Sequence, residues 1–215
     1  MCPVCTANMA LMASGATSSG GLGFILSKFF RRKKETKSEE TKMNLQQMEP
    51  ETGTNQVNLN FKQVPITKTG MLIRKPVADV FEAFINPAVT AKFWFTKSSG
   101  RLEGGKQLQW EWEMYGISIP VTAKAIERNK RILIEWVGYS GPTTVEWIFS
   151  PQKDGTTFVS ITEIGFAGDG DELVKQVTDS TQGFSLVLAG LKALLEHNVR
   201  LNLVADRFPK GIAEH

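Results

Sequence analysis

Hydrophobic and polar positions follow a period of two over much of the second half of the chain, which predicts a β-sheet. The segment QLQWEWEMY, residues 107–115, places Trp110, Trp112 and Met114 on one face, with polar residues between them. Runs of the same kind predict strands at residues 66–73, 117–127, 131–138, 143–151 and 156–164. Turn sequences such as KDGT separate these runs, so we expect antiparallel strands joined by short turns.

A helical period appears in three places. Residues 76–85 (PVADVFEAFI) open with a proline, which is favoured in a first helical turn, and a short helix is expected at residues 88–95. The last and longest helix is predicted from about residue 171 to 204, with one apolar stripe. Gly183 and Gly190 lie inside it, and each is about 1 kcal/mol less favourable than alanine there, which indicates a close approach of the helix backbone to the sheet or to something held between them.

The order of these elements predicts an α+β fold in which a curved antiparallel sheet wraps around the long C-terminal helix. The apolar face of the sheet and the apolar stripe of the helix would then cover each other. A strongly bent sheet around a helix can leave an apolar gap, and such gaps bind small ligands. We therefore expect a cavity between the sheet and the last helix.

The N-terminal region has a different composition. Residues 6–27 carry no charge and would span about 33 Å as a helix. Four consecutive cations follow at residues 31–34. This pattern predicts a single transmembrane helix over residues 6–30 with the folded domain on the cytoplasmic side; the alternative is an interfacial or disordered extension of a cytoplasmic protein. The expected division is a membrane anchor at 1–34, a flexible polar linker at 35–60 and a folded domain at 61–215.

Charge and cysteine content narrow the classes of function. Residues 1–56 carry seven Lys and Arg residues against five acids, and the rest of the chain carries 18 against 17, which argues against a nucleic-acid partner. Cys2 and Cys5 are the only cysteines. The alternatives for them are a redox pair, half of a metal site, or thiols that are free or lipid-modified. No metal constellation, catalytic triad or phosphate-binding loop is visible in the folded domain, and no cofactor is expected.

The candidate site residues come from the inner faces of the expected strands. Aromatic side chains such as Trp110, Trp112 and Trp147 would line either the cavity or an ordinary core. Glu163 alternates with apolar residues and would enter the apolar interior, where an ionised acid is unfavourable unless paired. Glu135 either does the same or, if the alternation of its strand is assigned to the opposite face, lies in solvent.

The chain from about residue 64 to 197 resembles the START-like, helix-grip superfamily, and within it the family named for the C-terminal domain of the activator of the heat-shock protein 90 ATPase. The resemblance rests on IRKPVADVFEAF, NPAVTAKFWF, LEGGKQLQW and TQGFSLVLAGLKALLE. These segments include an aromatic pair, Phe93 and Trp94, a Gly104–Gly105 turn, and a Gly183–Phe184 step where Trp is more usual in the family.

The resemblance implies a helix-grip fold with a pocket and leaves the activity open. Related domains bind lipids, polyketides or other hydrophobic molecules, and a few act as cyclases or hydrolases. The ligand-binding residues we expect are Trp110, Trp112, Met114, Glu135, Trp147, Glu163 and Phe184. A small hydrophobic ligand such as a lipid is the leading hypothesis; the alternatives are an enzyme that uses a cavity carboxylate, or a stress-related interaction module with a chaperone partner. The family's chaperone role belongs to larger proteins with a separate N-terminal domain, which residues 1–56 do not resemble.

Overall fold

A computed structural model describes residues 61–138 and 140–209. The predicted membrane anchor, the linker, Cys2 and Cys5 all lie outside these residues. Within the described part of the chain, no helix is both long and apolar enough to cross a membrane.

Seven strands form one antiparallel sheet in the order β1-β7-β6-β5-β4-β3-β2. Their bounds are β1 Thr67–Ile73, β2 Lys97–Ser98, β3 Gln107–Trp112, β4 Ile117–Glu127, β5 Arg131–Val137, β6 Pro142–Pro151 and β7 Thr157–Ile164. Strands β3 to β7 follow one another as neighbours, because short turns join each to the next, and β1 closes the far edge by pairing with β7. The predicted α+β class and the predicted strands are confirmed.

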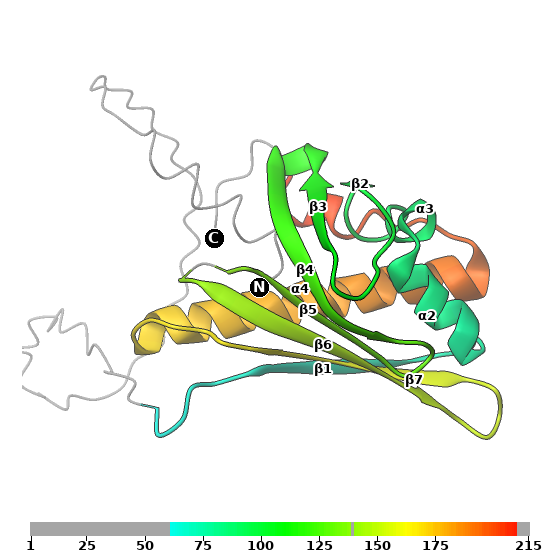
Figure 1. Cartoon of the computed structure of the whole chain (residues 1–215), viewed down its shortest axis with the longest axis horizontal. Helices are drawn as coiled ribbons and strands as arrows, with labels where there is room; N and C mark the ends of the chain where they lie inside the picture. The colour runs from blue at the N-terminus through cyan, green and yellow to red at the C-terminus, as the bar shows by residue number, and fades with distance from the viewer. Residues whose placement is uncertain (1–60, 139, 210–215) are drawn as a thin grey trace, which may run out of the picture. The chain divides into compact units, whose positions relative to one another are not determined.

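The helices are α2 Val77–Ile85, α3 Pro87–Thr90 and α4 Gly170–His197, with short 3-10 turns η3 Glu113–Tyr115 and η4 Ala205–Arg207. Figure 1 shows α4 running along one face of the sheet, with α2 and α3 near one of its ends. Helix α3 is shorter than the predicted span of residues 88–95. Three aromatic residues come after it, and all of them are buried: Phe93, Trp94 and Phe95. Packing of these side chains, and not a helical period, determines the conformation of this segment.

Helix α4 has well-defined ends. At its start, the Asp169 carboxylate accepts a hydrogen bond from the Glu172 backbone N–H at 3.0 Å, and the Glu172 carboxylate accepts one from the Asp169 N–H at 3.3 Å. At its end, Asn198 takes a left-handed conformation with φ 54°, which stops the helix after His197. The prediction that this helix continues to residue 204 is therefore wrong.

Strand β3 also ends earlier than its alternating sequence predicts. Trp112 pairs with Ile117, so the four residues between them form the connection from β3 to β4. The chain reverses there through η3 and Gly116, which has a positive φ of 64°. Met114 therefore lies in this connection, half-buried against the edge of the core, and the prediction that it shares the strand face of Trp110 and Trp112 is wrong.

The core lies between the inner face of the sheet and α4. Its side chains alternate along the strands, as in the buried pair Val159 and Ile161 of β7, and α4 contributes a stripe that includes Leu188 and Leu191. The outer face of the sheet is mixed and more exposed. The inward-pointing side chains of β3 to β7 form one core with residues of α4, of α2 and of the segment around Trp94.

Candidate functional site

Glu163, near the end of β7, is a carboxylate with no solvent exposure. It accepts hydrogen bonds from the Thr143 hydroxyl at 2.6 Å, the Trp136 indole N–H at 2.9 Å and the Ser180 hydroxyl at 2.5 Å. These three donors are neutral and come from β6, β5 and α4. The carboxylate therefore ties the inner face of the sheet to the helix.

Strand register explains why these groups meet. Trp136 pairs with Thr143 across β5 and β6, and Glu163 pairs with Val145 one inward-facing position further along β6. All three polar side chains therefore point to the same side of the sheet, since residues two apart share a face. Ser180 reaches them from the N-terminal half of α4.

More buried polar groups surround this cluster. Thr67, which pairs with Glu163 across β1 and β7, has no solvent exposure, and its hydroxyl donates to the Val177 carbonyl at 3.3 Å. Gln176 on α4 donates to the Ala167 carbonyl at 2.8 Å, while its own side-chain oxygen is buried with no hydrogen-bond partner among the described residues. One end of the interior is thus polar, which is unusual for a core, because buried polar groups are unfavourable unless they are hydrogen-bonded.

The rest of the interior is aromatic. Trp94 lies at its centre, with ring centroids 5.0 Å from Trp110 and 5.8 Å from Trp147. Phe184 of α4 stacks on Trp136, with centroids 5.9 Å apart and an interplanar angle of 17°. Since Trp136 also donates to Glu163, this stacked pair joins the aromatic part of the interior to the polar part.

Trp94 fills the space in which we expected a cavity beside Trp110, Trp112 and Trp147. It is only 3% exposed and contacts rings from the sheet and from α4. At this position a side chain from the segment after α3 lies between the sheet and α4. Sequence reasoning placed Trp94 near the end of a short helix at residues 88–95, whereas the segment after α3 inserts it into the interior.

Gly190 explains how this segment reaches so far inward. A Cβ atom at Gly190 would lie 3.3 Å from both the Cβ and the carbonyl oxygen of Phe93, tighter than ordinary van der Waals contact. The predicted close approach to the backbone of α4 is confirmed at this glycine. Its partner is the segment that carries Trp94.

Three indole N–H groups inside the domain have no hydrogen-bond partner among the described residues: those of Trp94, Trp112 and Trp147. A buried donor without an acceptor is unfavourable by about 1–3 kcal/mol. The aromatic part of the interior therefore holds unused donors, and the polar part holds the Glu163 acceptor.

The structure brings together most, though not all, of the residues predicted for the site. Trp110, Trp112, Trp147, Phe184 and Glu163 are all buried in the interior between the sheet and α4. Met114 lies in the β3–β4 connection. Glu135 lies on the outer face of β5, where it pairs with Lys124 at 3.1 Å, so the alternative of a solvated acid is confirmed for this residue.

Sequence reasoning missed four residues that complete the interior: Trp94, Trp136, Thr143 and Ser180. Trp136 could have been found by assigning the faces of β5 the other way. When Glu135 points outward, its neighbour Trp136 points inward. The sequence contains no pattern that would identify Thr143 or Ser180. A hydroxyl can be recognised as part of the site only when its hydrogen-bond partner, Glu163, is known to lie beside it. The described residues contain no group of three or more His, Cys, Asp or Glu side chains that could hold a metal ion.

Comparison with known proteins identifies relatives of this domain. The sequence model of the family described as "Activator of Hsp90 ATPase homolog 1-like protein" matches residues 74–196. A search of curated proteins finds no match.

Solved structures share the fold. The protein SSP2350 from Staphylococcus saprophyticus is 31% identical, with a TM-score of 0.55 over 64% of this chain and 96% of that one. DynU16, from the dynemicin biosynthetic locus, is 18% identical, with a TM-score of 0.56 over 63% of this chain and 48% of that one. The Aha1 dimer from Colwellia psychrerythraea is 16% identical, with a TM-score of 0.54 over 62% of this chain and 97% of that one. The last two likenesses concern the fold alone.

Proposed function

Because the chain belongs to the family of activator of Hsp90 ATPase homolog 1-like proteins, with its START-like helix-grip fold, we propose that the domain binds a small hydrophobic molecule between the sheet and α4. The molecule has an apolar body and one polar group. Its apolar body lies against aromatic side chains such as Trp110, Trp147 and Phe184, and its polar group meets Glu163.

The buried Glu163 carboxylate is the observation that carries this proposal. A carboxylate of zero exposure inside an aromatic core is unfavourable for folding, and a neutral apolar residue would fill the same position more readily. Its hydrogen bonds from Trp136 and Ser180 orient it within the interior. A perturbed environment around an acid of this kind is typical of functional sites.

The unused indole donors support the same proposal. A ligand oxygen could accept a hydrogen bond from Trp94, Trp112 or Trp147, which have no acceptor among the described residues. Because Trp94 now occupies the centre of the interior, a ligand must displace its ring. We therefore expect binding to be accompanied by movement of the segment between α3 and β2, and to be slow compared with diffusion.

Native mass spectrometry of the full-length protein purified from cells tests this function. A co-purified molecule of lipid-like mass, released on denaturation, is the expected result. All five tryptophans lie in the domain, so extracted lipid added back should change the intrinsic fluorescence. Repeated absence of a bound mass, together with fluorescence that does not respond to the extract, would overturn the proposal.

Two matched substitutions locate the binding site. Glu163→Gln should weaken binding about tenfold, as expected when a charge-assisted hydrogen bond is lost. Glu135→Gln makes the same chemical change on the outer face, where the side chain pairs with Lys124, and should leave binding unchanged. Equal effects of the two variants would argue against a site at Glu163.

We further propose that residues 6–30 attach the domain to a membrane. The uncharged run at residues 6–27 and the cations at 31–34 support this proposal. The test is fractionation of cells that express either the full chain or a chain without residues 1–34. The full chain should stay with membranes after an alkaline wash while the shortened chain is released, and a full chain found in the soluble fraction would refute the proposal.

A further inference from the structure

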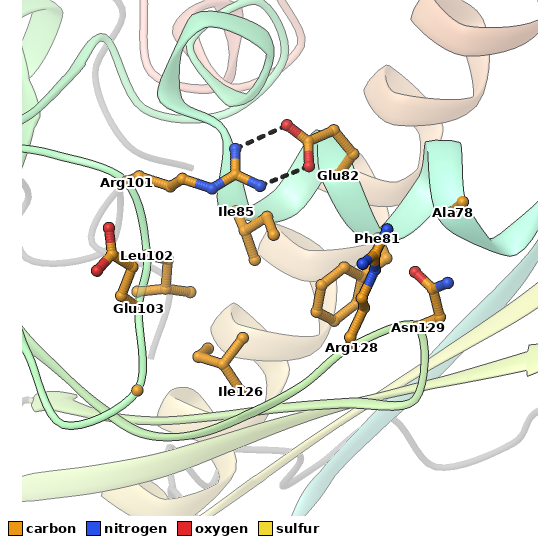
Figure 2. Close-up of a pocket in the computed structure, with 11 residues that line it drawn as sticks. Ala78, Phe81, Glu82, Ile85, Arg101, Leu102, Glu103, Ile126, Arg128 and Asn129 are labelled. Atoms are coloured by element: carbon orange, nitrogen blue, oxygen red, sulfur yellow. Dashed lines mark hydrogen bonds and ion pairs between the residues drawn. The ribbon is translucent and has the colours of Figure 1, made fainter.

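A pocket with a volume of about 510 Å³ lies beside α2. Three segments line it: α2, the chain just before β3, and the β4–β5 hairpin. Figure 2 shows the side chains that face it from these segments. Its volume lies in the range of small-molecule sites.

The floor of this pocket is apolar. Phe81 and Ile85 of α2 and Leu102 of the segment before β3 are each less than a tenth exposed, and Ile126 of β4 adds a half-buried side chain. The Leu102 N–H donates to the Ile85 carbonyl at 3.0 Å, which fixes the two walls against each other. An alkyl or aryl group placed here would be removed from water on one side.

The two acids at the pocket are already neutralised by cations. Glu82 accepts two hydrogen bonds from the Arg101 guanidinium, at 2.7 and 2.6 Å, and Glu103 pairs with Lys106 at 2.6 Å. The hydrogen bonds from Arg101 hold the pKa of Glu82 below its ordinary range, although burial opposes them. Both carboxylates are thus ionised and matched at neutral pH.

Arg128 lines the same pocket from the β4–β5 hairpin with an exposed side chain, and it makes no hydrogen bond or ion pair with any residue the structure describes. Its charge helps to lower the pKa of the Glu82 carboxyl, after the larger effect of Arg101. Asn129, beside it, adds an amide donor. In Figure 2, Arg128 and Asn129 lie on one side of the pocket and Glu103 lies on the other, so an anion beside Arg128 would be far from the Glu103 carboxylate.

We propose that this pocket binds a small amphiphilic carboxylate, with its carboxylate on Arg128 and its apolar chain on Phe81, Ile85 and Leu102. The site is separate from the interior site at Glu163. A neutral molecule would gain no ion pair with Arg128, and a short anion would leave the apolar floor in water.

Isothermal titration of the full-length protein with octanoate tests the proposal. We expect millimolar binding that weakens at high salt, is weaker for butyrate, and is absent for octylamine. Arg128→Gln should weaken octanoate binding about tenfold, as for loss of a charge-assisted hydrogen bond. Lys130→Gln removes the same charge from the same hairpin, outside the pocket, and should leave the affinity unchanged.

Three outcomes would overturn the proposal. The first is equal binding by the Arg128→Gln variant and the unsubstituted protein, and the second is no binding of octanoate at all. The third is loss of octanoate binding in Glu163→Gln, since that would place the octanoate in the interior. Because the pocket proposal predicts that Glu163→Gln keeps its octanoate affinity, this site and the interior site can fail independently.

Discussion

Replacing Glu163 by glutamine or by leucine separates the charge of this buried group from its hydrogen bonds. The glutamine variant keeps one side-chain oxygen, which can accept from Trp136 and Thr143 as the carboxylate does at 2.9 and 2.6 Å. Its NH₂ group can donate to the Ser180 hydroxyl, which is free to turn. We therefore expect Glu163→Gln to change the free energy of unfolding by no more than about 1 kcal/mol.

Glu163→Leu keeps the size of the side chain and removes the acceptor. The hydroxyls of Thr143 and Ser180 then lose this partner, whereas the Trp136 N–H still has the Thr143 oxygen at 2.8 Å. Two buried hydroxyls at about 1–3 kcal/mol each give a loss of about 4 kcal/mol. For a domain of this size, such a loss corresponds to a melting temperature lower by about 8–16 °C.

Urea denaturation followed by tryptophan fluorescence measures the free energy of unfolding of each variant. All five tryptophans lie in the domain, so the signal reports on its unfolding. Glu135→Leu is the control: its side chain is 40% exposed, so losing the pair with Lys124 should change stability by less than about 1 kcal/mol. If Glu163→Leu unfolds at the same urea concentration as the unsubstituted protein, the network does not hold the sheet to α4. If glutamine is as destabilising as leucine, hydrogen bonding alone does not explain the role of Glu163.

Three further predictions concern packing, pH and helix capping. Trp94→Ala should lower the free energy of unfolding by about 3–5 kcal/mol in urea, and added indole should restore part of it; an unchanged midpoint would contradict the buried position of Trp94. Burial raises the pKa of Glu196, but hydrogen bonds from the Arg74 backbone and the Lys192 ammonium outweigh it and hold that pKa below its ordinary value of 4.5. This stabilisation is present above pH 4.5 and is lost as the pH falls through the lowered pKa, so thermal melts of Glu196→Gln should lie below those of the unsubstituted protein at pH 7 and converge with them in acid. Asn198→Gly should raise the melting temperature by about 2 °C, because glycine tolerates the φ of 54° that ends α4, and Asn198→Ala should lower it.

Local periodicity was enough to predict most of the strands, the two longer helices and the inward face of β7. In β7, Val159, Ile161 and Glu163 alternate with more exposed residues, so the inward position of Glu163 follows from its own strand. The start of α4 falls near a sequence signal, its acidic first turn, whereas the end at Asn198 was missed because the predicted helix ran on to residue 204. Such signals act within a few residues, which is why they can be read without the rest of the fold.

The face of β5 could not be predicted in the same way. Its sequence RILIEWV is apolar at neighbouring positions, so either Glu135 or Trp136 satisfies the alternation. Pairing with β4 and β6 decides between them and turns Trp136 inward to Glu163. The position of Met114 could not be predicted for a related reason. The alternating pattern continues to Met114 in the sequence, but the pairing of β3 with β4 ends at Trp112.

The sequence by itself determined that this chain forms a curved sheet and a long helix with an acid between them, because those features depend on short-range spacing. Only the tertiary structure decided what fills the interior. Trp94 enters it through contacts with Trp110 and Trp147 and through the space that Gly190 leaves beside Phe93. These contacts join segments that are distant in the chain, and packing between distant segments leaves no periodic trace in either one.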